Sequence, residues 1–248
     1  MRYRVYSYRH GVDLLETVGQ YRPLWDELLG VIEGVSDEDL AARFREHHEG
    51  RSKSISATIN TLVDEGLVRR GWMRQAPIFA ASAYGDRTWL LDFAKEVEVP
   101  REAGMPDEEA RYADERSGIS IEVAFNHGGN VAWNLIKPVI ASEINHVPKA
   151  IQTSVGIVIA ATDSMKVMGG FDSAVGSYEK YVSHLVPLRT MLTVPLVIIG
   201  LEPCEAFHIR HERVGSNQRG WIEWNDGYEP LIPERPGPAL EPSPEGPE

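Results

Sequence analysis

The chain has 248 residues, 42% of them hydrophobic and 25% charged, which is the composition of an ordinary globular protein, and its formal net charge of −12 argues against nucleic-acid binding through overall charge alone. No apolar run reaches the roughly 20 residues of a membrane span and no signal-peptide core is present, so we expect a cytoplasmic protein. The single cysteine, Cys204, excludes a disulfide framework within the chain.

The N-terminal third of the chain is predicted to be mainly helical. Apolar residues at helical spacing, Pro23 at a helix start and Ser36 as an N-cap carry this prediction. The predicted elements are a strand at 2–8, helices beginning at Pro23, after Ser36 and near Ser54, and a short helix over 86–98.

The second half of the chain has the pattern of an α/β core. We predict a hairpin over 112–125, an amphipathic helix over Asn130–Asn145 that Pro138 kinks, and a helix over about 173–191. The apolar runs Ser154–Ala161 and Val194–Leu201 are typical of strands buried on both faces. The fold class expected is therefore α/β, with a mixed central sheet flanked by helices and at least one parallel crossover.

The expected domain organisation follows from these elements. Residues 1–228 are predicted to form one domain, with a helical part at 1–75 and a catalytic α/β core at 110–205. The remaining residues, 229–248, hold seven of the sixteen prolines and are predicted to be a disordered tail.

One carboxylate, Glu122, stands in the otherwise apolar run Ile119–Phe125. With a turn at Ser117–Gly118, a hairpin would bring Asp114 or Glu115 beside Glu122. Two carboxylates make a hard, oxygen-rich site suited to magnesium or manganese and to phosphodiester hydrolysis. A three-residue loop pairs Asp114 with Glu122, whereas an even-numbered loop favours Glu115. The alternative interpretation is that Glu122 lies on the solvent side of an ordinary strand.

Residues 37–72 also allow a winged-helix interpretation. Asp39–Glu46 would be the first helix and Ser54–Glu65 the recognition helix of a transcription regulator. Ser54, Ser56, Thr58 and Asn60 would then face a DNA groove, which is a different class of function from hydrolysis.

Taken in order, the segments of this chain resemble type II restriction endonucleases of the BglII/BstYI kind. The segments that carry the resemblance are Met1–Tyr8, a helix around Trp25, Asn60–Trp72, Ile121-Glu-Val-Ala-Phe125 and Val194–Pro203. Together they span about four fifths of the chain, and their collinear order carries more weight than any one of them.

The resemblance implies a PD-(D/E)xK nuclease core and a homodimer that cuts both strands of duplex DNA with Mg²⁺, for which Mn²⁺ can substitute. It implies metal binding by Asp114, Glu122 and the carbonyl of Val123, and in-line attack of water on the phosphodiester. The helix over Asn130–Asn145 would lie at the dimer and DNA interface. A cognate methyltransferase is the partner expected in a restriction-modification system.

This sequence departs from the family at two places. The spacing from Asp114 to Glu122 is one residue shorter than in the family, and Ala124 stands where relatives carry Gln and the wider superfamily carries Lys or Glu. Because an alanine neither orients nor deprotonates water, Asn126, His127 and Gln75 are the candidates to replace it. A catalytically inactive DNA-binding relative is therefore an alternative function.

The residues that contact DNA are predicted from local basic and polar clusters. These candidates are Ser54, Asn60, Arg210, Arg213 and Arg219.

Overall fold

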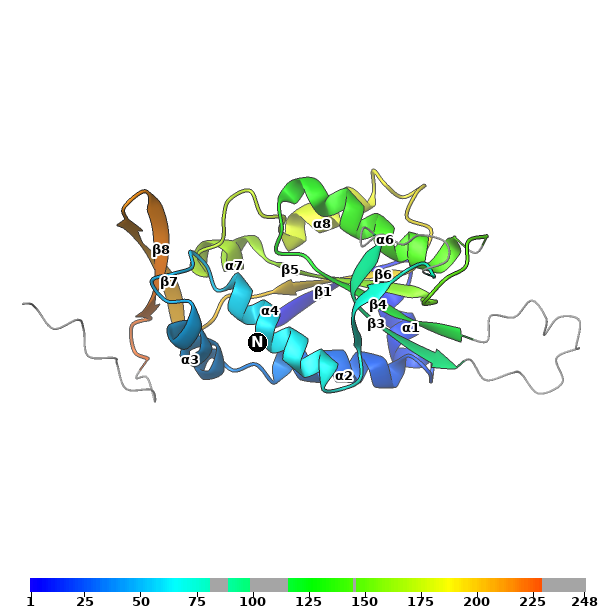
Figure 1. Cartoon of the computed structure of the whole chain (residues 1–248), viewed down its shortest axis with the longest axis horizontal. Helices are drawn as coiled ribbons and strands as arrows, with labels where there is room; N and C mark the ends of the chain where they lie inside the picture. Colours follow the sequence, from blue (N-terminus) through cyan, green and yellow to red (C-terminus); the bar gives the residue numbers. More distant parts are fainter. Residues whose placement is uncertain (81–88, 99–115, 145, 229–248) are drawn as a thin grey trace, which may run out of the picture.

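The computed structural model describes residues 1–80, 89–98, 116–144 and 146–228 and places a six-stranded mixed sheet at the centre of the molecule (Figure 1). The strand order is β1-β6-β5-β4-β3-β2. The sheet strands are β1 (Tyr3–Tyr8), β2 (Met73–Pro77), β3 (Leu90–Glu98), β4 (Arg116–Val123), β5 (Val155–Ala161) and β6 (Leu196–Leu201). The predicted α/β class with a mixed sheet is confirmed.

The three middle strands β4, β5 and β6 run parallel to one another. β1 pairs antiparallel with β6, β3 pairs antiparallel with β4, and β2 pairs antiparallel with β3. Every residue of β5 and of β6 is buried, as the two apolar runs predicted. The carboxyl ends of β4, β5 and β6 consequently meet at one edge of the sheet, which is where α/β proteins place their ligands.

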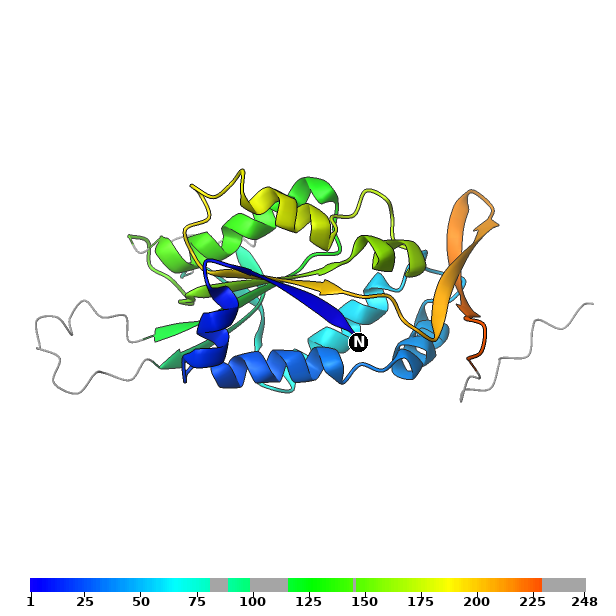
Figure 2. The same ribbon diagram turned by 180° about the vertical axis from the view of Figure 1, so that it is seen from behind.

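Helices cover both faces of the sheet (Figures 1 and 2). One face packs against α1 (Gly11–Thr17), α2 (Arg22–Glu33), α3 (Asp37–His47), α4 (Ser56–Val68) and α7 (Asp163–Met168). The other face packs against α6 (Val131–Glu143) and α8 (Tyr178–Leu185). In the described ranges, every helix is too short or too polar to cross a lipid bilayer.

A separate two-stranded hairpin, β7 (Phe207–Val214) and β8 (Asn217–Trp224), follows the last sheet strand. It stands at the end of the molecule toward which β6 runs, beside α3 (Figure 2). The loop between α3 and α4 fixes it there, because Gly50 N–H donates to Gly220 O at 3.0 Å and Gly220 N–H donates to Ser52 O at 2.9 Å.

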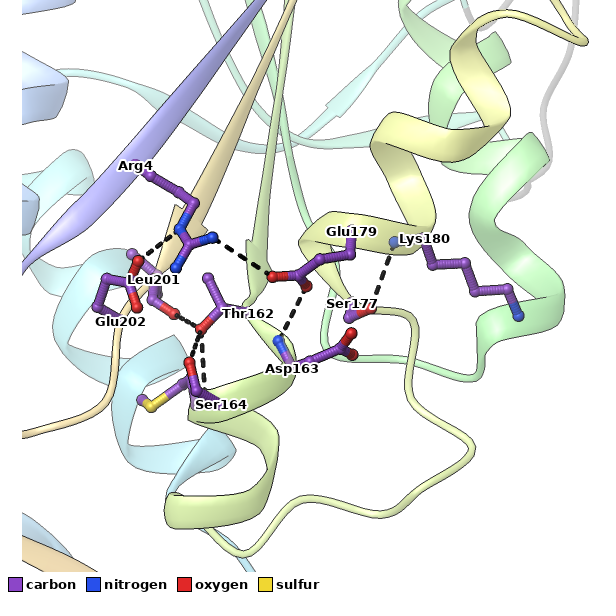
Figure 3. A network of polar contacts seen from close by, with 10 residues as sticks. Arg4, Thr162, Asp163, Ser164, Ser177, Glu179, Lys180, Leu201 and Glu202 are labelled. Atoms are coloured by element: carbon purple, nitrogen blue, oxygen red, sulfur yellow. Dashed lines mark hydrogen bonds and ion pairs between the residues drawn. The ribbon is translucent and has the colours of Figure 1, made fainter.

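A polar network ties the starts of α7 and α8 to the sheet (Figure 3). Thr162 caps α7 and also donates to Leu201 O at 3.0 Å, while Ser177 caps α8. Glu179 accepts a hydrogen bond from Asp163 N at 2.9 Å and pairs with Arg4 of β1. These contacts fix the helices next to the carboxyl ends of β5 and β6.

Two predicted elements are wrong. Leu90–Glu98 is a strand rather than part of a helix over 86–98, because pairing with β2 and β4 overrides the helical propensity of this segment. Ser117–Gly118 is not a turn, since β4 runs straight through it. Gly118 is required there for another reason: a side chain would clash with the backbone of Lys95 on β3.

The predictions for the other helices hold with changed limits. α6 agrees with the predicted Asn130–Asn145 to within two residues, and Pro138 lies inside it without ending it. Pro138 packs on Gly156 of β5, where a larger residue would clash, so α6 lies close to the sheet. The helix predicted over 173–191 is confined to Tyr178–Leu185.

Candidate active site at the carboxyl end of β4

Three polar residues lie side by side across the neighbouring strands β2, β3 and β4. Pairing of Phe93 with Ile121 places the preceding residue, Asp92, opposite Glu122. On the other side of β3, Arg74 of β2 pairs with Phe93 and Ala76 pairs with Leu91. Gln75, which lies between them on β2, is therefore opposite Asp92. The sheet therefore assembles a row of Gln75, Asp92 and Glu122 from segments far apart in the sequence.

Glu122 is buried, with 1% of its surface exposed. It shares one face of β4 with Ser120 and Ala124, both fully buried, while Ile119 and Ile121 pack on the other face. This burial excludes the interpretation of Glu122 as the solvent side of an ordinary strand. Its Oε2 atom forms an ion pair with Lys137, whereas Oε1 is buried and accepts no hydrogen bond from the described residues.

The carboxyl group of Glu122 has an unusual proton affinity. Burial, together with the neighbouring charge of Asp92, raises its pKa to about 8 against the opposing effect of Lys137. A carboxyl group shifted this far, with a free buried oxygen, is typical of a functional site rather than of a structural ion pair.

Asp92 lies at the start of β3, half-buried, and is held by two contacts. Its Oδ2 accepts a hydrogen bond from Val123 N at 2.8 Å, and its Oδ1 accepts one from Gln75 Nε2 at 3.4 Å. Gln75 has a φ angle of 48°, in the left-handed region that non-glycine residues rarely adopt. Backbone strain of this kind concentrates at functional sites, because surrounding structure must hold it in place.

Lys137 reaches the site from α6 on the face of the sheet that Glu122 occupies. Its Nζ contacts Glu122 Oε2 and donates a hydrogen bond to Leu90 O at 3.2 Å. Among the described residues, Glu122 and Lys137 are the two buried side chains that carry formal charge, and they contact each other.

A cleft of about 470 Å³ opens at this edge of the sheet. Its walls come from the exposed side of α4, from β2, and from the residues that flank Glu122. The lining residues that matter here are Asn60, Thr61, Arg74, Gln75, Asp92 and Val123. The cleft thus reaches Asp92 from the solvent side, while Glu122 lies buried behind the lining residues.

The second carboxylate predicted from the sequence, Asp114 or Glu115, lies outside the described residues. Asp114 and Glu115 fall in 99–115, beyond the described residues, and the Ser117–Gly118 turn that would fold either of them onto Glu122 does not exist. Asp92, which sequence analysis missed, occupies the position beside Glu122.

The predicted substitutes for Ala124 are spread over the site. Gln75 contacts Asp92, as described above. Asn126 is exposed and its Oδ1 accepts a hydrogen bond from Asn134 Nδ2 of α6 at 3.4 Å. His127 is exposed, and its Nδ1 accepts a hydrogen bond from Gly129 N, which caps the short helix η1 (Gly128–Asn130) rather than reaching Glu122.

The predicted DNA-contacting residues occupy two surfaces. Asn60 is exposed in the cleft, while Ser54 lies half-buried just before α4 and bonds to Ser56. Arg210 and Arg213 are exposed on β7, and Arg210 is paired with Glu212 and Glu223. On β8, Arg219 donates to the carbonyl of Arg51.

The recognition-helix alternative does not agree with the packing of α4. Thr58, one of the four residues expected in a DNA groove, is 2% exposed, because this side of α4 packs into the core with Ile59 and Val63.

The donor atoms at the site fit a magnesium ion. Asp92, the free Oε1 of Glu122 and the carbonyl of Val123 offer the hard oxygen ligands that Mg²⁺ prefers. Within the described ranges, no group of three or more His, Cys, Asp or Glu residues converges to form a complete metal cage. An ion bound by these few protein oxygens would complete its shell with water and substrate oxygens, as Mg²⁺ commonly does.

Titration of Glu122 should be visible in the stability of the metal-free protein. Because folding raises the pKa of this carboxyl from 4.5 to about 8, the folded state holds its proton more tightly than the unfolded state. We expect the stability of the wild type relative to Glu122→Gln to fall with rising pH between these values, by about 1.4 kcal/mol per unit. Urea unfolding in EDTA at a series of pH values measures this difference. A difference independent of pH would contradict the shifted pKa.

Comparison with known proteins identifies the family. The family model described as Restriction endonuclease BglII/BglIII matches residues 3–201. A crystal structure of restriction endonuclease BglII complexed with a DNA 16-mer is similar at a TM-score of 0.55, with 16% sequence identity over 91% of this chain and 100% of that chain. The crystal structure of free BglII covers the same shares at a TM-score of 0.42 and 12% identity. Comparison with curated proteins gives no match. The chain belongs to the BglII/BglIII family of restriction endonucleases.

Proposed function

We propose that this protein is a magnesium-dependent type II deoxyribonuclease that cuts both strands of double-stranded DNA at a specific sequence. The observation that carries the proposal is the buried Glu122, with one oxygen free, beside Asp92 at the carboxyl edge of the sheet. Membership of a restriction endonuclease family supports the reaction class. A DNA complex of BglII, which shares this fold, supports duplex DNA as the substrate.

The reaction is hydrolysis of a phosphodiester. The oxygen of a water molecule forms a new bond to phosphorus in line with the bridging oxygen whose P–O bond breaks. The water loses a proton to solvent and the leaving oxygen gains one, so that the products are a phosphate monoester and an alcohol.

The residues of the site have two roles, which are binding of the metal ion and orientation of its ligands. Asp92 and Glu122 would hold the magnesium ion with the carbonyl of Val123, and a bound magnesium ion supplies positive charge that stabilises the phosphorane-like transition state. Gln75 orients Asp92 through its hydrogen bond.

We propose further that the active form is a homodimer, in which each of two active sites cuts one strand of the duplex. The exposed Trp133 on α6, whose ring lies 5.6 Å from that of Trp89, supports a contact on this helix. A cognate methyltransferase that modifies the same sequence would protect the host DNA.

A second candidate function is an inactive DNA-binding relative. The observation that favours it is Ala124, fully buried and apolar on the same face as Glu122, where relatives carry a polar side chain. The two candidates differ in one respect, namely whether any other residue of this chain compensates for Ala124.

Digestion of plasmid and phage DNA by the purified protein, with Mg²⁺ or Mn²⁺, tests the proposed function. We expect discrete fragments and no cutting in EDTA. Tight binding to one DNA sequence without cutting would establish the inactive relative instead. A protein that neither cuts nor binds DNA would show that the activity of the family does not extend to this chain.

A further inference from the structure

The contact between Lys137 and Glu122 is costly to build. Both side chains are buried, at 8% and 1% exposure, and moving two charges out of water costs several kcal/mol each unless the geometry compensates. A well-packed apolar pair would serve stability as well, so retaining a buried lysine against a buried carboxylate points to a chemical role.

Only one of the two carboxylate oxygens of Glu122 is engaged in this contact. Lys137 engages the Oε2 side of Glu122 and the carbonyl of Leu90, while Oε1 of Glu122 has no partner among the described residues. One oxygen of the carboxylate is therefore held by a cation of the protein, and the other is buried without a hydrogen-bond partner among the described residues. A metal ion bound at Oε1 would leave the contact between Lys137 and Oε2 in place.

Lys137 also lies where a polar side chain from the end of β4 is missing. On the Glu122 face, the next side chain along the strand is Ala124, which carries no polar atom. Lys137 comes from α6, the helix that covers this face of the sheet. The helix packs against β5 through Pro138 and Gly156 and so brings the ammonium group to Glu122. One turn earlier on α6, Asn134 donates to the buried Tyr181 at 2.7 Å, which fixes the rotation of the helix.

We propose that Lys137 is a catalytic residue of this nuclease, supplying from helix α6 the cationic side chain that position 124 lacks. This inference rests on the proposed nuclease function. The ammonium group, held by Glu122 beside Asp92, donates a hydrogen bond to the attacking water and offsets the negative charge that builds on the phosphate. It remains an ammonium throughout and takes no proton from the water, which releases its proton to solvent.

The first test removes the charge at nearly constant shape. Lys137→Met is expected to lower the single-turnover rate of plasmid cleavage by about 10²-fold to 10³-fold, the effect of losing one charge-stabilising donor in an active site. Lys95→Met is the matched control, because Lys95 forms a half-buried ion pair with Glu27 on the opposite face of the sheet. We expect the control to cleave like the wild type even where its melting temperature falls.

The second test moves the charge to the strand. The double variant Lys137→Met with Ala124→Lys places a lysine two residues after Glu122 on the same face of β4, within reach of the same carboxylate. We expect it to recover at least about tenfold of the activity lost in Lys137→Met, a rate difference of about 1.4 kcal/mol. If Lys137→Met fails to fold, the double variant carries the test alone, because it keeps a cation beside Glu122.

The Mg²⁺ affinity of Lys137→Met distinguishes a catalytic role of Lys137 from a role in holding the metal ion. Removing a cation from beside two carboxylates does not weaken their attraction for Mg²⁺, so calorimetric titration of Lys137→Met at pH 8.5 is expected to give an affinity equal to or above that of the wild type.

Three results would overturn the proposal for Lys137. Cleavage by Lys137→Met within threefold of the wild type would remove the catalytic role. Loss of Mg²⁺ binding together with cleavage would show that Lys137 acts only through the metal site. A folded double variant without recovered cleavage would show that a cation at this place is not sufficient. A wild-type protein that cuts no DNA would instead overturn the proposed function, and this inference with it.

Discussion

Asp92→Asn is expected to lower the single-turnover cleavage rate by about 10³-fold, the equivalent of roughly 4 kcal/mol of transition-state stabilisation. Asp92 lies opposite Glu122 across the β3–β4 pair and holds Val123 N at 2.8 Å, so it is the carboxylate that completes the site. Asparagine keeps the shape and the hydrogen bond from Val123 but removes the charge that would hold the metal ion.

Asp114→Asn is the comparison that makes this prediction specific, because Asp114 is the metal ligand that the resemblance to the family implies. We expect it to cleave within about threefold of the wild type, which is below the 1.4 kcal/mol of a tenfold effect. The reverse outcome, with Asp114→Asn inactive and Asp92→Asn active, would remove Asp92 from the site. Plasmid cleavage by the three proteins under enzyme excess gives the answer directly.

Glu122→Gln is expected to have an effect of the same size, a loss of about 10³-fold or more in cleavage. The substitution removes the anionic oxygen that is buried without a hydrogen-bond partner, and a neutral amide binds Mg²⁺ poorly. Binding of a DNA duplex in Ca²⁺ should persist, since Glu122 is buried behind the cleft surface rather than exposed on it.

The matched control for Glu122→Gln is Glu27→Gln. Glu27 pairs with Lys95 and accepts a hydrogen bond from Trp72, so its loss removes a comparable ion pair on the other side of the sheet. We expect this control to retain cleavage. If Glu122→Gln cuts DNA as fast as the control, Glu122 has no place in the chemistry.

The part of the fold that local sequence pattern determines was predictable. The apolar runs of β5 and β6 and the helical spacing of α2, α3, α4 and α6 report burial within a single element. Glu122 was found for the same reason, because a lone carboxylate in an apolar strand is visible without knowledge of its neighbours.

The rest of the site depends on pairing between elements, which the local pattern does not contain. Asp92 was missed because its segment has good helix formers, and it becomes a site residue only through the β3–β4 register. Gly118 was interpreted as a turn residue, although its role is to let β3 approach closely. The signal for Asp92 was present in the run Leu90-Leu-Asp-Phe93, which places one acid among apolar residues as the Glu122 strand does.

Lys137 was missed for a related reason. A lysine within an amphipathic helix ordinarily lies on its solvated face, and the close approach of Pro138 to Gly156 is what turns this one toward the sheet. The absence of a polar residue at position 124 was the only sequence signal that another element had to supply one.

The most direct measurement is an anomalous difference map from crystals of the full chain grown with Mn²⁺. We expect a peak within about 2.5 Å of carboxylate oxygens from both Asp92 and Glu122, the range of oxygen ligands around such cations. Lys137 should remain in contact with Glu122 in the same crystal. A manganese peak held by other side chains, with Asp92 and Glu122 bare of metal, would contradict the assignment of the active site.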